Sequence, residues 1–311
     1  MHTTLSKLFR EIEAELGTHE FCIMALEALK SALLQYKIKD REELQHQLLL
    51  IFKLLKITKP RYAILLDSFY KILDECETSK TDIPIEELIM RIDRIIVAYQ
   101  LEKLQLVQAS EGIDFDDKSI LIHDHSHFIH SVLASMNQKG KRFTVIVAEQ
   151  NMEKTEDNIE FLHSHDIEYK VVPAHMLSHI EETVDMVFCG AVTFQENMNF
   201  VMDPGSKAII SHFHYEKKPI YVFITTSKFT LWPLTEESHE VYAKPDIGYH
   251  HVLTDIEYER IKFSHDRVSV DLIDYIVTEQ GIFKPKELKE IFRDMFKKRA
   301  KKRERYFGEE N

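Results

Sequence analysis

Residues 186–229 read MVFCGAVTFQENMNFVMDPGSKAIISHFHYEKKPIYVFITTSKF, and this stretch decides the fold. An apolar run from Met186 to Cys189 meets Gly190-Ala191, Pro204-Gly205-Ser206 then opens a helical pattern, and Ile220 to Ile224 forms a second apolar run. A strand, loop, helix and strand in this order predict a parallel crossover, with glycine where the backbone approaches closely. Ligands bind beyond the carboxyl ends of strands in open α/β sheets. The stretch therefore also locates the candidate pocket.

The rest of the second half of the chain alternates in the same way. Further strands are predicted at 119–122, 143–148 and 169–172, and helices at 128–136, 155–165, 176–183, 204–214, 272–279 and from Pro285 onward. An irregular segment rich in proline, glycine and charge follows Trp232-Pro233 and extends to about Asp255. Strands that alternate with helices predict an α/β fold with a Rossmann-like, doubly wound and mostly parallel sheet.

The first 110 residues show a helical pattern throughout. Leu5, Phe9, Ile12 and Leu16 follow a 3.6-residue period, and a long final helix is predicted from Ile85 to Ala109. Another helix is predicted from Pro60 to about Cys76, followed by a loop over 78–84. No glycine occurs between Gly17 and Gly112, which favours a helical bundle. We therefore expect an all-helical N-terminal domain (1–112) and a Rossmann-like C-terminal domain (113–311).

Composition excludes several classes of protein. The net charge of -12 argues against a general nucleic-acid binder, although residues 297–303 form a basic run at the end of the terminal helix. No run of 18 apolar residues exists, and the N-terminus lacks the apolar core of a secretion signal. The three widely separated cysteines favour reduced thiols, so we expect a cytoplasmic protein.

A histidine-rich run follows the first predicted strand. It reads His123-Asp124-His125-Ser126-His127, and His130 lies three residues beyond it. Spaced imidazoles at a strand end could bind zinc, but neighbouring side chains point in different directions and no recognised ligand spacing is complete. We therefore expect no metal site, and interpret the run as a polar loop and helix cap facing the crevice. A metal-dependent hydrolase is the corresponding alternative.

Nucleotide and acyl-transfer motifs are missing from the sequence. No glycine fingerprint, Walker loop or Gly-x-Ser-x-Gly elbow is present, so no cofactor is expected. Cys189 lies in an apolar strand, which favours a buried thiol over a nucleophile. Ser126 and Ser206 stand at predicted helix starts, with Lys207 nearby. These positions could attract a phosphate, or the two serines could be ordinary N-caps.

At these residues the chain resembles the alpha, beta and delta regulatory subunits of eukaryotic initiation factor 2B. The related enzymes are the ribose-1,5-bisphosphate and methylthioribose-1-phosphate isomerases. The resemblance covers residues 115–290 and is carried by four blocks. The first, second and fourth blocks are residues 119–126, 143–149 and 268–288. The third block consists of residues 184–191 together with Glu196-Asn197, Gly205-Ser206 and Lys218-Pro219. It implies a crevice that binds a phosphorylated small molecule, a sugar phosphate or a nucleotide. The ligand-binding residues implied are His123, Ser126, Glu149, Gly190, Glu196, Asn197, Gly205 and Ser206.

The chain departs from the isomerase pattern where chemistry would occur. The isomerases have a cysteine just after the first-strand histidine and an aspartate just after the Gly-Ala pair, where this chain has Asp124 and Val192. Valine cannot transfer a proton. The Asn-Lys pair that helps hold substrate reads Met202-Asp203. No catalytic residues are therefore expected.

The first hypothesis is a non-catalytic, initiation factor 2B-like regulatory or scaffold protein of translation initiation, the type of subunit found in a guanine-nucleotide-exchange complex. The resemblance implies a homodimer or higher oligomer with an initiation factor 2-type protein partner. The alternative is a sugar-phosphate aldose-ketose isomerase with a rearranged site, in which Asp124 and Glu196 replace the usual acid–base pair.

Overall fold

The computed structural model describes residues 2–35, 41–57, 62–78, 85–149, 152–233, 244–245 and 261–307. Three predictions lie wholly or mostly outside these ranges: the loop at 78–84, of which only Thr78 is described, the helix start at Pro60, and the irregular segment after Trp232-Pro233. Within them, no helix combines the length and the apolar character needed to cross a membrane.

Four helices form the N-terminal part: α1 (His2–Gln35), α2 (Arg41–Ile57), α3 (Ala63–Thr78) and α4 (Ile85–Ala109). The bounds of α4 are those predicted from the apolar period. Apolar side chains from all four helices form one core, in which Phe21, Phe52 and Tyr99 are fully buried. The α1 helix is kinked at Gly17, whose φ of 75° and ψ of 159° are open to glycine alone.

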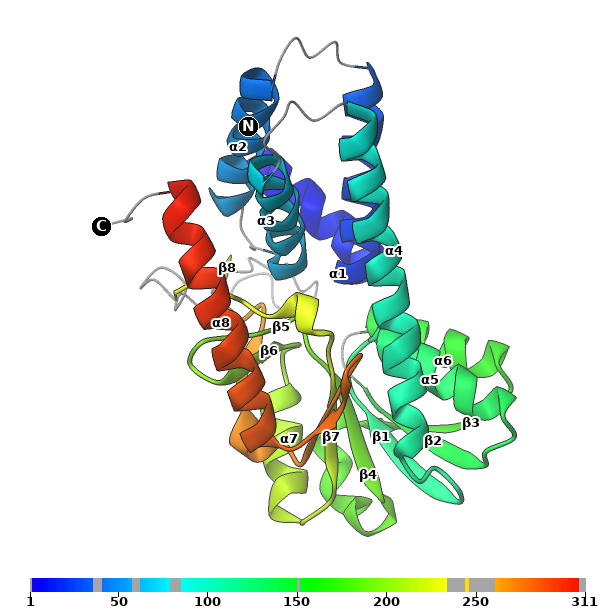
Figure 1. Ribbon diagram of the computed structural model, residues 1–311. Coiled ribbons are helices and arrows are strands. Elements are labelled where there is room, and N and C mark those ends of the chain that lie inside the picture. Colours follow the sequence, from blue (N-terminus) through cyan, green and yellow to red (C-terminus); the bar gives the residue numbers. More distant parts are fainter. Residues whose placement is uncertain are drawn as a thin grey trace, which may run out of the picture.

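The sheet has seven strands in the order β12-β11-β7-β4-β1-β2-β3 (Figure 1). Their bounds are β1 (Lys118–Ile122), β2 (Phe143–Glu149), β3 (Glu168–Pro173), β4 (Met186–Gly190), β7 (Ile220–Phe223), β11 (Tyr275–Thr278) and β12 (Gly281–Phe283). All neighbours pair in parallel except the edge pair of β11 and β12. The predicted α/β class and mostly parallel sheet are confirmed.

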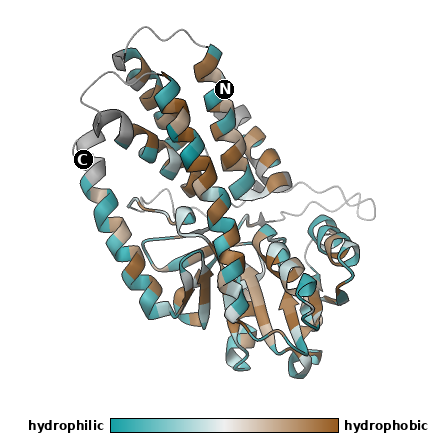
Figure 2. Ribbon diagram, turned by 45° about the vertical axis from the view of Figure 1, so that its right-hand side comes forward, coloured by the Kyte–Doolittle hydropathy of each residue, from teal (hydrophilic) through white to brown (hydrophobic). Residues whose placement is uncertain are grey.

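Both faces of the sheet are covered. The helices are α5 (His127–Gln138), α6 (Met152–Ser164), α7 (Ser206–Tyr215) and α8 (Pro285–Phe307). In β1, Ile120 and Ile122 belong to one core with α5 and the end of α4, whereas Leu121 belongs to the other core with α7 and α8. The central strands β1, β2, β4 and β7 are therefore largely buried, as expected for a parallel sheet covered on both faces, and Figure 2 shows the ribbon coloured by hydropathy.

Short elements complete the fold. They are a small sheet of β5 (Thr193–Phe194), β6 (Asn199–Met202) and β10 (Asp266–Ser269), a pair of β8 (Lys244–Pro245) and β9 (Ile261–Lys262), and the 3-10 turns η1 (Ser110–Gly112), η2 (Ala174–His179), η3 (Glu181–Thr183), η4 (Thr226–Lys228) and η6 (Val270–Leu272). The small sheet inserts between β4 and α7, and brings β10 beside the start of α7.

Two predicted helices are wrong. Residues 272–279 contain strand β11, whose Ile276 lies opposite Val222 of β7. A short apolar run with β-branched residues is more stable paired with a neighbouring strand than as a helix. Residues 176–183 form parts of the 3-10 turns η2 and η3 instead of an α-helix. The predicted helix at 204–214 is confirmed but begins at Ser206.

The terminal helix α8 connects the two parts of the chain. Its Phe292 is buried in the core beneath the sheet. Two turns further on, the Arg299 guanidinium forms an ion pair with Asp67 of α3 and lies 4.6 Å above the Tyr70 ring. Figure 1 shows α8 rising from the sheet toward α2 and α3. The helix α8 therefore ties the helical part to the sheet.

Candidate ligand-binding crevice

The order of the strands places a crevice between β1 and β4. From β1 the chain proceeds to β2 and β3 on one side, and then returns to β4 on the other. Connections therefore diverge at the carboxyl ends of β1 and β4, and this switch point is where ligands bind in open α/β sheets. A cavity of about 240 Å³ lies there. Its lining is Leu16–Glu20, Lys103, Asp124–Phe128, Lys154, Gly190–Val192, Asp203, Lys228, Ser264 and His265.

Asp124 and Gly190 join the two strand ends. Asp124 is 5% exposed, and its Oδ2 accepts a hydrogen bond from the Gly190 N–H at 2.6 Å. Its Oδ1 is buried and has no hydrogen-bond partner among the described residues. Burial, with a smaller contribution from the charge of Asp203, raises the pKa of Asp124 to about 7. The crevice thus contains a carboxyl group that can change its protonation near neutral pH.

Gly190 cannot be replaced without moving this site. A Cβ at Gly190 would lie 2.6 Å from Ser126 Oγ and 2.8 Å from Asp124 Oδ2. The absence of a side chain therefore lets the end of β4 approach the loop that follows β1. This agrees with the sequence interpretation, which placed glycine where the backbone approaches closely.

His123 supports the crevice from outside its lining. The ring is 3% exposed, and Nε2 lies 3.1 Å from the Pro204 carbonyl oxygen, which can only accept, so Nε2 carries the proton. Burial lowers the pKa of His123, which favours the neutral ring. A Cβ at Gly205 would approach Nε2 to 3.0 Å. His123 and Gly205 therefore pack against each other beneath the start of α7.

The N-terminus of α7 is already occupied by a carboxylate. Gly205, with φ of 96°, is the N-cap residue. The Gly205 and Lys207 N–H groups both donate to Asp266 Oδ2 at 2.9 Å. Ser206 is fully buried, and its Oγ has no partner among the described residues, so the N-cap interpretation of Ser206 is wrong. Ser126 does stand at the N-cap of α5, but its side chain makes no capping hydrogen bond.

The histidine run forms a stack of rings. The His125 ring lies 4.8 Å from that of His127 and 4.9 Å from that of His130, centroid to centroid. His125 Nδ1 contacts Asp157 Oδ2 at 2.9 Å, and burial lowers the pKa of His127 and His130 to about 4. Across the described part of the chain, no three histidine, cysteine, aspartate or glutamate side chains are placed to share a metal ion.

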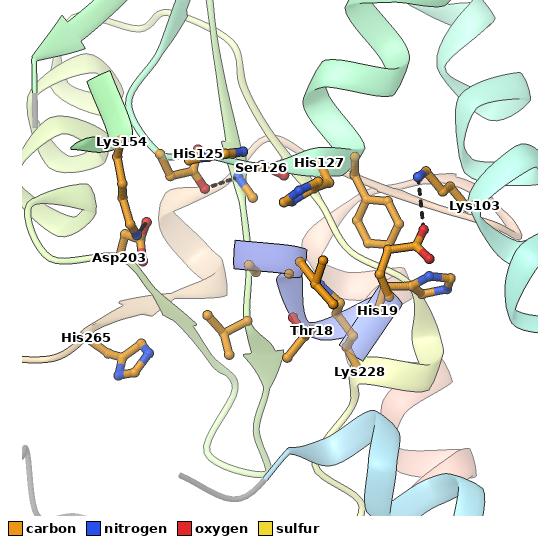
Figure 3. A pocket seen from close by; sticks show the side chains of 18 of the residues that line it. Thr18, His19, Lys103, His125, Ser126, His127, Lys154, Asp203, Lys228 and His265 are labelled. Carbon is orange, nitrogen blue, oxygen red and sulfur yellow. Dashed lines mark hydrogen bonds and ion pairs between the residues drawn. The ribbon is translucent and has the colours of Figure 1, made fainter. Parts of the chain in front are cut away.

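Two lysine–carboxylate ion pairs lie at the two ends of the crevice (Figure 3). Lys154 and Asp203 point toward each other and form an ion pair. In the same view, Lys103 lies far from this pair and contacts Glu20 at 3.3 Å. Lys228 is 8% exposed, and its ammonium nitrogen lies 4.7 Å from the centroid of the Phe128 ring.

The sequence did not identify the residues that close the crevice. The kink at Gly17 lies among cavity-lining residues that include Thr18 and His19, and a Cβ at Gly17 would lie 2.9 Å from His127 Nδ1. His19 is 6% exposed, and burial lowers its pKa to about 4. A lone glycine in a long helical pattern was the available signal for Gly17. Lys103, Lys154 and Lys228 carried no local signal.

The sequence-predicted residues divide into two groups. Ser126 and Gly190 line the cavity, and His123, Gly205 and Ser206 lie at the adjoining start of α7. Glu149 is exposed at the end of β2, and Glu196 and Asn197 are exposed between β5 and β6; none of these three lines the cavity. Cys189 is fully buried, and burial raises the pKa of its thiol well above the usual range.

Known proteins share this architecture. A family model described as the initiation factor 2 subunit family matches residues 14–285. Among curated relatives, translation initiation factor eIF2B subunit delta of Dictyostelium discoideum is 23% identical over 67% of this chain and 36% of its own length. Subunit alpha from the same organism is 27% identical over 56% of both chains. The chain therefore spans about a third to a half of the length of these relatives.

Solved structures agree in fold. The translation initiation factor eIF-2B of Pyrococcus horikoshii OT3 has a TM-score of 0.69 at 18% identity, covering 90% of this chain and 97% of that one. The tetrameric eIF2B-beta2-delta2 complex from Chaetomium thermophilum gives 0.70 at 18% identity, covering 94% and 93%. At this identity the likeness shows the fold alone.

Proposed function

Because the chain belongs to the initiation factor 2 subunit family, we propose that it is a non-catalytic, initiation factor 2B-like subunit with a regulatory or scaffold role in translation initiation. The observation that carries the non-catalytic part is Val192. This residue lines the cavity immediately after Gly190-Ala191, where the related isomerases have an aspartate. Valine offers no group that can donate or accept a proton. The crevice is retained, and its second proton-transfer group is missing.

The proposal assigns recognition to the crevice. The cavity is bounded by the kinked α1 on one side and by the ends of β1 and β4 on the other. A ligand between them would contact both the helical part, residues 1–112, and the Rossmann-like part, residues 113–311. Binding could thereby stabilise one arrangement of the two parts, which is the physical requirement for a sensor. A phosphorylated small molecule is the ligand class implied by the family resemblance.

Assembly is the second part of the proposal. One structural neighbour is described as a tetrameric complex of beta and delta subunits. For this chain we propose a homodimer or higher oligomer in the cytoplasm, in contact with an initiation factor 2-type protein. The division of the chain into a helical N-terminal domain, residues 1–112, and a Rossmann-like C-terminal domain, residues 113–311, also belongs to the proposal.

Mass measurement by light scattering after size exclusion tests assembly. The full-length chain is measured alone and after mixing with purified initiation factor 2. We expect a mass of at least a dimer alone, and a larger species containing both proteins after mixing. A monomer at micromolar concentration that does not co-elute with initiation factor 2 would contradict the proposal.

The alternative, a sugar-phosphate isomerase, is favoured by one observation. Asp124 is a buried carboxyl group in the cavity with a pKa of about 7, which suits proton transfer. Glu196, its proposed partner, is exposed on the β5–β6 turn and does not line the cavity. An assay on ribose-1,5-bisphosphate and methylthioribose-1-phosphate separates the two functions. Turnover that is abolished by Asp124→Asn would establish the enzyme, and we expect no turnover of either compound.

A further inference from the structure

We propose that the outer face of α4 is an interface between two copies of this chain, whose α4 helices pair in antiparallel directions. The inference rests on the assembly proposed above and assigns a surface to it. Figure 1 shows α4 along one side of the helical part, continuing down toward the sheet. The face, which we call the α4 seam, consists of Met90, Arg94, Val97, Leu101, Leu104 and Gln108.

The positions of the α4 seam have the spacing of a coiled coil. They recur at alternating intervals of four and three residues, which places their side chains in one row along the helix. Ile92, Ile95 and Tyr99 belong to the core of the helical part, and at 3.6 residues per turn they lie on the opposite side of α4. The helix therefore has two apolar faces, and the core of the helical part uses one of them.

The α4 seam is exposed and carries little charge. Its apolar members are each about half exposed or more: Met90, Val97, Leu101 and Leu104. Within the described residues 95–109, the other exposed side chains are uncharged: Ala98, Gln100, Gln105 and Gln108. Glu102 and Lys103 are only partly exposed, because each bonds to a residue of another element. Depletion of charge around exposed apolar side chains is typical of the core of a protein interface.

The α4 seam fits its own copy when the two helices run antiparallel. Val97 then lies opposite Leu101 of the second copy, and Leu101 lies opposite Val97 of the second copy. The same register pairs the outer positions of the seam with one another: Met90 with Gln108, and Arg94 with Leu104. Such a contact is closed by a twofold axis and needs no second kind of surface. Ala98 lies next to the axis, where a small side chain lets the helices approach each other.

A parallel pair would bring like charges together. Each seam residue would then face its own counterpart, so Arg94 would lie opposite Arg94 of the second copy, which is unfavourable. In the antiparallel pair, Arg94 packs its apolar stem beside Leu104 while its guanidinium reaches solvent. The charge pattern of the seam therefore favours the antiparallel arrangement.

The length and area of the α4 seam suit a reversible contact. Met90 to Leu104 extend over about 21 Å of helix, at a rise of 1.5 Å per residue. The seam and its flanking side chains in two copies would bury roughly 1,000 Å² in total, which is near the lower limit for a specific interface. We therefore expect pairing at micromolar concentration, with a mass that depends on concentration.

Replacement of single seam leucines tests the surface. Leu101→Glu and Leu104→Glu each place a carboxylate in the apolar row, where its burial between two copies is unfavourable. The matched control is Leu50→Glu, because Leu50 on α2 is 46% exposed, close to the 48% of Leu101, and lies outside the seam. At a concentration where the parent chain is fully assembled, light scattering should give each seam variant about half the parent mass, and the control the parent mass. Circular dichroism checks that the variants are folded. Folded seam variants that keep the parent mass, or a parent chain that is monomeric at every concentration, would overturn the inference.

Cysteine cross-linking tests the antiparallel register. Val97→Cys and Leu101→Cys are prepared as separate full-length chains, mixed, and treated with oxidised glutathione, and the parent chain is treated in the same way as the control for native thiols. In the proposed register the two substituted positions lie opposite each other only between the two variants, within reach of a disulfide. The mixture should therefore form a covalent dimer, and each variant alone should not. A covalent dimer that Val97→Cys forms equally well alone, or a mixture that forms none, would refute the register.

Mixing the same variants with initiation factor 2 separates this inference from the proposed function. If Leu101→Glu keeps the parent mass by itself but no longer co-elutes with initiation factor 2, the α4 seam binds that protein and the pairing of two copies is wrong. That outcome leaves the proposed function standing. A parent chain that neither assembles nor binds initiation factor 2 contradicts the proposed function itself.

Discussion

Replacement of Asp124 by asparagine should change how the stability of the protein depends on pH. Burial raises the pKa of Asp124 from about 3.8 to about 7 in the folded chain. Between these two values the folded state holds a proton that the unfolded state has released. The free energy of unfolding therefore falls as pH rises from about 4 to about 7, and the loss persists at higher pH. Asparagine, which stays neutral, removes this loss.

The magnitude follows from the two pKa values. A pKa difference of about 3, at about 1.4 kcal/mol per pKa unit, corresponds to about 4 kcal/mol when the whole interval has been crossed. Part of the loss has already occurred at pH 5. Between pH 5 and pH 8, the stability of Asp124→Asn relative to the parent chain should therefore grow by about 2 to 3 kcal/mol.

Urea unfolding at a series of pH values measures this difference. His19, His127 and His130 have lowered pKa values, so each destabilises the fold as pH falls below about 6.5. These contributions are common to both proteins and cancel in the difference. Asp271→Asn serves as the control and should run parallel to the parent chain. The free energy of unfolding of Asp124→Asn minus that of the parent chain should grow as pH rises. A value that stays constant or shrinks would refute the assigned pKa and its cause.

Three further changes probe other parts of the fold. Arg299→Ala should lower the free energy of unfolding by about 2 kcal/mol, because Asp67 stays buried and loses its guanidinium partner, keeping Lys71 and the Tyr99 hydroxyl. A loss below 0.5 kcal/mol in urea unfolding would disagree. Gly17→Ala should lower the free energy of unfolding by about 1–3 kcal/mol in the same assay, since the backbone at this position suits glycine alone and the new Cβ would contact His127. A variant more stable than the parent chain would contradict the backbone conformation assigned to Gly17. The Cys189 thiol is fully buried with a raised pKa, so peptide mapping should find it labelled by a thiol reagent only after denaturation, and not in the native chain.

Much of the sheet could be predicted from local patterns. The β4–α7–β7 crossover was visible because apolar runs bounded by glycine and proline identify buried strands. The error at 272–279 has a specific cause. A short apolar run there fits a helix or a strand equally well by periodicity, and the pairing of Ile276 with Val222 of a strand some fifty residues earlier decides for the strand.

The candidate site was only partly predictable for the same reason. Asp124 and Gly190 stand directly after predicted strands, so their meeting at one edge of the sheet follows from the parallel topology. Asp266 caps α7 across 61 residues of sequence, which no local pattern records. Glu196 was selected by resemblance, and the β5–β6 turn leaves it exposed.

By itself the sequence determined which segments are buried strands, where the parallel crossover lies, and which strand ends converge on a crevice. These properties depend on side chains within a few residues of one another. The tertiary structure alone decided that the kinked α1 closes this crevice, that Lys154 neutralises Asp203, and that Asp266 fills the start of α7. Such contacts join distant segments, and their energies exist only once the chain has folded and excluded water from between them.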